Sequence, residues 1–254
     1  MVTKDPTHSL CIILGMHKSG TSFLVSSLFN SGFSVGHDVS EIGYQKSKGE
    51  SPELIDINCE ILGAKGFHSL SIYRKRDYPD STTLIDQFLS KQEDTQLALK
   101  DPRMVLTYLD HWKPILPEHK IIITFRNPFY VMRHYARHVN SRTKWSTIFR
   151  SLRAWRAYNT ELLQIIERAK VETFITEFET ILNQEEERKH FSQFVGFDIS
   201  FFTENRKPEK VPTWKLFVGK ALGFPIYQQL KSKIRRLRNL QKKVIKVLIQ
   251  KRKK

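Results

Sequence analysis

A short stretch rich in glycine and hydroxyl residues has the spacing of a phosphate-binding loop. The stretch reads Gly15-Met-His-Lys-Ser-Gly-Thr-Ser22 and lies between an apolar run and a segment of helical periodicity. Small residues at such a junction let backbone N–H groups turn toward a phosphate, and the helix N-terminus adds its positive dipole end. Nucleoside triphosphate-binding loops carry a lysine directly after the second glycine. Here Thr21 follows Gly20 and the lysine is Lys18, so we expect contact with a different part of a phosphate-bearing ligand.

Two further groups of charged residues follow predicted strands. Arg126 comes directly after the apolar stretch 120–125, and Lys100-Asp-Pro-Arg103 follows the stretch 97–100. In open α/β sheets the carboxyl ends of the strands border the ligand crevice. A guanidinium there can grip a phosphate through two hydrogen bonds, although a surface ion pair explains Arg126 as well. Lys100 and Arg103 could stabilise developing negative charge, while Asp101-Pro102 also fits the start of a helix.

Strands and helices alternate along the chain. Apolar strands are predicted at 10–14, 97–100, 120–125 and 171–175. Helices are predicted at 21–30, 51–62, 82–91, 101–112, 128–138 and 145–169, with Ser51 and Asn127, each followed by proline, as the caps at which two of them start. Such alternation predicts an α/β fold with three layers, in which helices cover both faces of a central, mainly parallel sheet, as in phosphate-loop nucleotide-binding proteins. We expect one such domain over residues 1–215 and a basic, amphipathic helical tail over residues 216–254.

The net charge of +16 is concentrated in that tail. Residues 231–254 hold 12 Lys and Arg and no Asp or Glu, so residues 1–230 carry only +4. A basic amphipathic helix over residues 230–254 can lie on an anionic membrane surface, and an acidic polysaccharide or a solvated extension remains as an alternative. No nucleic-acid-binding motif is present, so we expect no specific nucleic acid partner. No apolar run is long enough to span a bilayer, and the two cysteines agree with a reducing compartment, which together predict a cytoplasmic protein with peripheral membrane contact.

The glycine loop resembles that of sulfotransferases that use 3′-phosphoadenosine 5′-phosphosulfate (PAPS). It is similar to the G-M-H-R-S-G-T-S loop of a bacterial group, with Lys18 in place of Arg. The resemblance implies that Lys18 contacts the 5′-phosphosulfate and supports the leaving oxygen. It also implies that the 5′-phosphate is cradled by the rest of the loop, to which we assign the cofactor-binding residues His17, Ser19, Gly20, Thr21 and Ser22.

Arg126-Asn-Pro is similar to the second signature of the family, whose arginine holds the 3′-phosphate. The family has a serine eight residues later, where this chain has His134, and we assign His134 to the same phosphate as a hydrogen-bond donor. His134 and His138 also have the spacing of metal ligands on a helix. Arg133 and Arg137 flank them and would repel a cation, so we expect no metal.

The remaining resemblance concerns the residues expected to do the chemistry. Lys48-Gly-Glu50 resembles the family's N-P-K-G-Y-F-E segment, which implies that Glu50 is the general base, although a helix start alone also favours a glutamate. Lys100-Asp-Pro-Arg103 looks like the K-D-P-R turn of the bacterial members and makes Asp101 a second candidate base. The stretches from Trp155 to Asn159 and from Phe178 to Ile181 resemble the W-x-x-Y-N and Y-E-D-L segments, and we expect their aromatic residues to pack in the core. The resemblance covers residues 9–198.

The chain is thus predicted to be an enzyme that moves a sulfuryl group from PAPS to a hydroxyl or amine of a carbohydrate, lipid or small-molecule acceptor. The catalytic residues are predicted to be Lys18, Glu50, Lys100 and Asp101. Two alternatives remain from the sequence. One is a nucleoside triphosphate-dependent kinase of the same fold, which Thr21 disfavours. The other is a noncatalytic basic binding module that keeps the fold.

Overall fold

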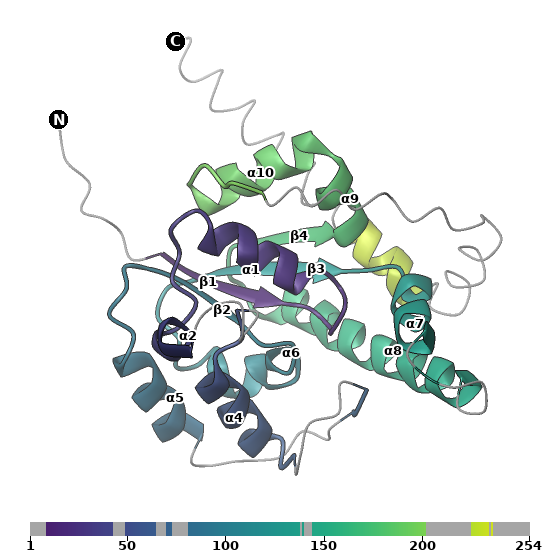
Figure 1. Ribbon diagram of the computed structural model, residues 1–254, viewed down its shortest axis with the longest axis horizontal. Helices are drawn as coiled ribbons and strands as arrows, with labels where there is room; N and C mark the ends of the chain where they lie inside the picture. The colour runs from purple at the N-terminus through teal and green to yellow at the C-terminus, as the bar shows by residue number, and fades with distance from the viewer. Residues whose placement is uncertain are drawn as a thin grey trace, which may run out of the picture.

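We analysed a computed structural model of the chain, which describes residues 9–42, 49–64, 70–72, 81–137, 139, 144–201, 225–233 and 235. Its centre is a four-stranded parallel sheet (Figure 1) in the order β2-β1-β3-β4. The strands are β1 (Ser9–Leu14), β2 (Gln96–Lys100), β3 (Lys120–Phe125) and β4 (Thr173–Glu177). The strands therefore confirm the predicted α/β class. The last strand begins two residues later than predicted, after a turn at Lys170 with a φ of 53°.

The register explains why the strands read as unbroken apolar runs. Ile12 of β1 lies opposite Leu99 of β2 on one side and Ile121 of β3 on the other. Both faces of a parallel sheet are covered, so side chains that alternate between the faces are all withdrawn from water. Cys11 to Leu14 are accordingly 0% exposed.

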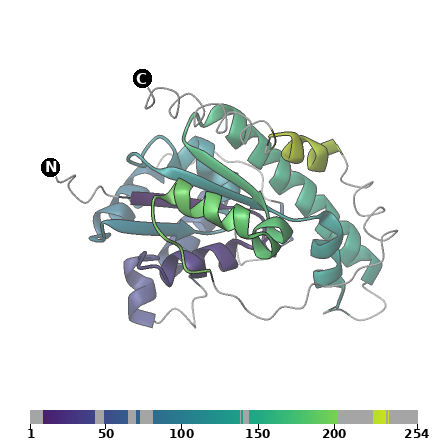
Figure 2. The same cartoon turned by 90° about the horizontal axis from the view of Figure 1, so that it is seen from above.

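Helices cover both faces of the sheet (Figure 2), which gives the three predicted layers. One face packs against α4 (Pro52–Ile61), α5 (Ser81–Ser90), α6 (Met104–Thr107), the π-helix η1 (Tyr108–Trp112) and α8 (Lys144–Arg168). The other face packs against α1 (Thr21–Phe29), α2 (His37–Ile42), α9 (Phe178–Asn183) and α10 (Glu185–Val195). Helix α7 (Pro128–Arg137) lies beyond the carboxyl end of β3 and packs against α8 (Figure 1).

The predicted helix starts at Ser51 and Asn127 are confirmed. The Ser51 hydroxyl accepts the backbone N–H of Leu54 at 3.1 Å, and the Asn127 side chain accepts that of Phe129 at 3.0 Å. The helix predicted from Asp101 differs. It begins at Met104 and changes to a π-helix at Tyr108. The Asp101 carboxylate accepts the N–H of Arg103 instead of capping the helix.

The first part of the predicted tail belongs to the core. Residues 225–233 are helical, and Tyr227 and Leu230 are buried in the larger hydrophobic cluster. The Tyr227 hydroxyl donates to Glu177 at 2.6 Å, and Lys231 forms an ion pair with the same carboxylate. The division of the chain at residue 215 stays a prediction, and most of residues 230–254 lie outside the described residues. In the described part of the chain, no helix has both the length and the apolar character to cross a membrane.

Candidate functional site

The predicted site residues follow strands whose carboxyl ends meet at one edge of the sheet. The loop Gly15–Gly20 follows β1, Lys100 ends β2, Arg126 follows β3, and Phe178 follows β4. In the sheet, β1 lies between β2 and β3. The chain passes from β1 to β2 on one side and then crosses to β3 on the other, so the strand order reverses at β1. Such a reversal opens a crevice outside the carboxyl ends in α/β sheets. The arrowheads in Figure 1 all point toward this edge, next to α7.

The backbone of the glycine loop requires its two glycines. A Cβ on Gly15 would lie 2.5 Å from the carbonyl oxygen of Thr124, and a Cβ on Gly20 would overlap the ring of Phe178. Gly20 also has a φ of 100°, and Lys18 has a φ of 67°, a left-handed conformation that a residue with a side chain rarely adopts. Strain of this kind is found where the surrounding structure fixes a functional loop.

Hydrogen bonds fix the loop to β3. The Ser19 hydroxyl donates to the carbonyl of Met16 at 2.6 Å, and the Thr124 hydroxyl donates to the carbonyl of Ser19 at 2.9 Å. Ser19 and Thr21 are buried, whereas Lys18 and Ser22 are exposed. Gly20 is the N-cap of α1 and has no side chain to accept the first N–H groups of that helix. The loop thus presents helix N–H groups and an exposed lysine, a combination that suits an anion.

At the end of β2, Lys100 joins two other predicted residues. Its ammonium group donates to Glu50 at 2.5 Å and to the hydroxyl of Ser22 at 3.3 Å, and its side chain is 0% exposed. Burial lowers the pKa of Lys100, and the neighbouring Glu50 carboxylate opposes that shift. The Glu50 side chain keeps 25% of its surface exposed, so one carboxylate at this end of the sheet reaches solvent.

Asp101 is placed differently from Glu50. It is 0% exposed, and its carboxylate accepts the Arg103 guanidinium at 2.6 Å and the Asn58 amide at 2.9 Å. Asn58 in turn accepts hydrogen bonds from Thr107 and Trp112. Burial raises the pKa of Asp101 to about 6, and the charge of Arg103 opposes the rise. Asp101 therefore fixes the position of the Arg103 guanidinium through a buried ion pair.

His17 lies in the same neighbourhood. Burial, followed by the positive charges of Arg103, Lys100 and Lys18, lowers the pKa of His17 to about 3. Its imidazole is consequently neutral at physiological pH, and the positive charge of this region comes from the lysines and arginine alone.

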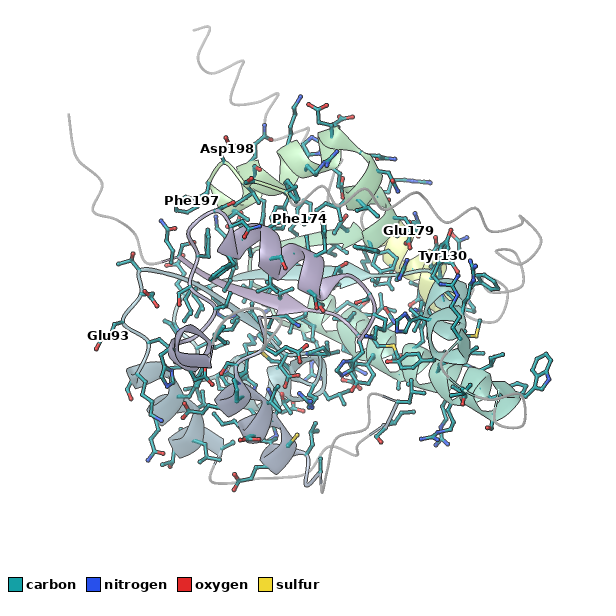
Figure 3. The ribbon with its side chains drawn as sticks, viewed as in Figure 1. Glu93, Tyr130, Phe174, Glu179, Phe197 and Asp198 are labelled. Atoms are coloured by element: carbon teal, nitrogen blue, oxygen red, sulfur yellow. The ribbon has the colours of Figure 1, made fainter. Side chains whose placement is uncertain are left out.

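At the end of β3, Arg126 is held between two aromatic rings. The guanidinium carbon lies 5.1 Å from the ring centre of Tyr130 and 4.9 Å from that of Phe178. Its Nε donates to Glu179 at 2.6 Å, and one terminal nitrogen lies 3.5 Å from the carbonyl oxygen of Lys18. Figure 3 shows Glu179 and Tyr130 side by side at this end of the sheet. Arg126 thus forms the ion pair considered from the sequence, while its terminal nitrogens lie toward the glycine loop.

Trp155 fixes the backbone at the same point. It is 1% exposed, as expected for core packing, and its indole N–H donates to the carbonyl of Arg126 at 2.9 Å. Tyr158 and Asn159 are also buried.

The structure places His134 in α7, with its ring edge-on to Tyr135 at 5.7 Å between centres. Tyr130, Phe178 and Glu179 lie around Arg126, and the assignment of His134 to a phosphate stays a prediction. His138 lies outside the described residues. Within the described ranges, no three His, Cys, Asp or Glu side chains are grouped so as to hold a metal ion.

Sequence reasoning missed three residues of this arrangement, namely Asn58, Tyr130 and Glu179. Glu179 had a usable signal, because it follows a predicted strand as Arg126 does, and parallel strands end at the same edge. Asn58 had no such signal, since it reaches Asp101 across the fold, and Tyr130 contributes through its ring, which lies four residues after Arg126.

A shallow hollow of about 650 Å³ lies elsewhere, between α10 and the residues that follow it. Arg188, Phe197, Asp198 and Phe201 are among its lining residues. Figure 3 places Phe197 and Asp198 far from Glu179 and Tyr130. We therefore keep this hollow separate from the site at the carboxyl ends of the strands.

No protein-family model matches the chain, and no curated protein matches it. Among solved structures, the chain is similar to a sulfotransferase domain from the olefin synthase of Synechococcus PCC 7002. The identity is 16%, the alignment covers 84% of each chain, and the TM-score is 0.46. It is also similar to a sulfotransferase domain from the curacin biosynthetic pathway, at 12% identity and a TM-score of 0.45, over 80% of this chain and 78% of the other.

Proposed function

We propose that this protein transfers a sulfuryl group from PAPS to a hydroxyl or amine of an acceptor. The observation that carries the proposal is the cationic edge of the sheet. A terminal nitrogen of Arg126, which follows β3, lies 3.5 Å from the backbone carbonyl of Lys18 in the glycine loop that follows β1, and in this loop Thr21 replaces the lysine of triphosphate-binding loops. A ligand with one phosphate group at its 5′ position and another at its 3′ position suits two separate cations better than a triphosphate does.

The residues present fit such a donor at both of its charged ends. The N-terminus of α1, with glycine as its cap, and the exposed Lys18 would hold the 5′-phosphosulfate. Arg126, fixed by Glu179 through Nε, has terminal nitrogens that lie toward the glycine loop and would hold the 3′-phosphate. His17, Ser19, Thr21, Ser22 and His134 are proposed as further contacts. The bound donor supplies an activated sulfuryl group, and Lys18 supports the oxygen that leaves it.

Glu50 is the better of the two candidate bases. Its carboxylate is partly exposed and borders Ser22 of the loop through Lys100. The Asp101 carboxylate is fully buried and already accepts bonds from Arg103 and Asn58. A base must reach the proton that it removes. We therefore assign proton acceptance from the acceptor to Glu50, charge stabilisation to Lys100, and the positioning of Arg103 to Asp101.

Titration calorimetry with 3′-phosphoadenosine 5′-phosphate tests the proposal, with ATP and 5′-AMP as controls. We expect a clear preference for the 3′-phosphorylated ligand, which is lost in Arg126→Ala. Equal or tighter binding of ATP would overturn the proposal in favour of a kinase. Binding of none of the three would favour a noncatalytic module.

Kinetic measurements test the assigned roles. Lys18→Ala should abolish release of 3′-phosphoadenosine 5′-phosphate from PAPS in the presence of an acceptor. Glu50→Gln should lower kcat by about a hundredfold or more, the range of general-base catalysis, and leave donor affinity unchanged. A full rate in the Glu50→Gln enzyme would remove Glu50 from the mechanism.

The acceptor class and the cellular location are part of the same proposal. We propose a cytoplasmic enzyme whose acceptor is a carbohydrate, a lipid or a small metabolite, and whose basic residues 230–254 contact an anionic membrane. Each lysine or arginine at such a surface contributes about 1 kcal/mol. Sedimentation with anionic vesicles tests the contact, and no binding at moderate salt would exclude it.

A further inference from the structure

Helix α8 presents two exposed aromatic side chains one turn apart at its N-terminal end. Trp145 is 70% exposed and Phe149 is 64% exposed, the two highest values among the exposed large hydrophobic residues in the described part of the chain. Residues four apart lie on the same face of a helix, so the two rings form one patch. Scattered single apolar residues on a surface need no explanation, but adjacent ones indicate an interaction site.

The same helix face is basic. Arg153 lies one turn beyond Phe149 and Arg156 one turn beyond Arg153, so these two exposed side chains continue the patch along α8, and the exposed Arg150 borders it. The sequence from residue 127 to residue 160, which includes all of α7 and the first part of α8, contains seven Lys and Arg and no Asp or Glu. The two aromatic rings therefore lie in a segment of the chain whose only charged residues are positive.

We infer that this face of α8 docks onto the surface of an anionic lipid bilayer. Tryptophan and phenylalanine rings insert at the boundary between headgroups and acyl chains, and arginines pair with anionic headgroups. A polysaccharide would account for the arginines and for a stacked Trp145, but the neighbouring Phe149 ring favours an apolar environment. The described start of the basic tail lies elsewhere, since Lys233 contacts Glu167 at the opposite end of α8.

The position of this face bears on the acceptor, and this part rests on the proposed function. Helix α7 begins directly after Arg126 and packs against α8 beyond the carboxyl ends of the strands (Figure 1). Docking through α8 would hold the crevice close to the headgroups. A hydroxyl carried by a membrane lipid is then the acceptor class that we infer.

Binding to vesicles tests the docking face in the whole 254-residue chain. The probes are vesicles of phosphatidylcholine with phosphatidylserine, compared with phosphatidylcholine alone. We expect Trp145→Ala with Phe149→Ala to weaken binding to the anionic vesicles at least tenfold. Each of Arg153→Ser and Arg156→Ser should weaken it about fivefold. Phe29→Ala removes an exposed aromatic residue from α1 and serves as the matched control, with unchanged binding.

Tryptophan fluorescence separates this face from the tail. Trp112 and Trp155 are buried, and Trp214, outside the described residues, is replaced by Phe. Quenching by brominated lipids then reports on Trp145. We expect strong quenching with anionic vesicles.

Three results would overturn the inference: undiminished vesicle binding by the double variant, unquenched Trp145, or a dimer that is lost in the double variant. Binding of 3′-phosphoadenosine 5′-phosphate is measured in parallel. Its failure in the wild type would reject the proposed function and the acceptor class, while vesicle binding would still decide the docking face.

Discussion

The charged residues of the candidate site are buried at the carboxyl end of β2 and only partly buried at the carboxyl end of β3. At the end of β2, Lys100, Asp101 and Arg103 are buried and are paired with Glu50, with Asn58 or with each other. At the end of β3, Arg126 is only partly buried and lies between two rings, with Glu179 on one side. Loss of one partner from a buried pair leaves an uncompensated charge, whereas a partly exposed pair is screened by water. The β2 end should therefore support the stability of the fold, and the β3 end should mainly bind.

The largest expected effect is a difference in the free energy of unfolding between variants at the carboxyl ends of β2 and β3. Asp101→Ala leaves the Arg103 guanidinium buried without its carboxylate, so we expect the free energy of unfolding to fall by about 3–5 kcal/mol. Arg126→Ala should lower it by only about 1 kcal/mol, because that pair is partly exposed. Urea unfolding of both variants measures the difference. Similar losses in the two variants would show that the ends do not differ as described.

The second expected effect is a loss of stability at low pH that depends on His17. The pKa of His17 is about 3 in the folded protein because of burial and nearby cations, against an ordinary value of 6.5. Below pH 6.5 the unfolded chain binds a proton that the folded chain does not, so stability is lost as the pH falls from 6.5 toward 3. At pH 5 this loss amounts to about 2 kcal/mol relative to pH 7. His17→Gln should lack it in urea unfolding at the two pH values. An equal loss in the variant would place the acid sensitivity elsewhere.

The smallest expected effect tests the β3 end. Glu179→Ala frees the Nε of Arg126, so the guanidinium loses its fixed direction. We expect the affinity for 3′-phosphoadenosine 5′-phosphate to fall about fivefold, the value of one hydrogen bond of about 1 kcal/mol, with little change in the melting temperature. Glu179→Gln retains an acceptor for Nε and should keep most of the affinity. Tighter binding in both variants would mean that Glu179 competes with the ligand.

The sequence was sufficient for the four strands and for the helices that leave a strong local signal, whereas the short helices α2 and α9 and the helix α10 were not predicted. Unbroken apolar runs predicted the buried strands, and Ser51 and Asn127 predicted two helix starts. Charged residues directly after strands predicted Lys100 and Arg126 at one edge, since parallel strands end together.

What the sequence could not provide depends on contacts across the fold. The choice between Glu50 and Asp101 follows from the burial of Asp101. Its carboxylate accepts a hydrogen bond from Asn58, which is distant in sequence and also contacts Thr107 and Trp112. In the same way, Tyr227 and Leu230 belong to the helical segment predicted for residues 216–254, and its pattern did not show that these two side chains pack in the core. The average composition of a segment does not show which of its side chains pack against the rest of the protein.

Because Gly20 contacts Phe178, the glycine loop cannot reach its final conformation until the chain has been synthesised as far as Phe178. Gly20 belongs to the first strand–helix unit, whereas Phe178 follows the last strand of the sheet. During translation the loop leaves the ribosome long before the ring that fixes its backbone, and pairing across such sequence distances is slow. A nascent chain that ends before β4 should therefore have no binding loop, and ligand binding would indicate that the whole sheet has been completed.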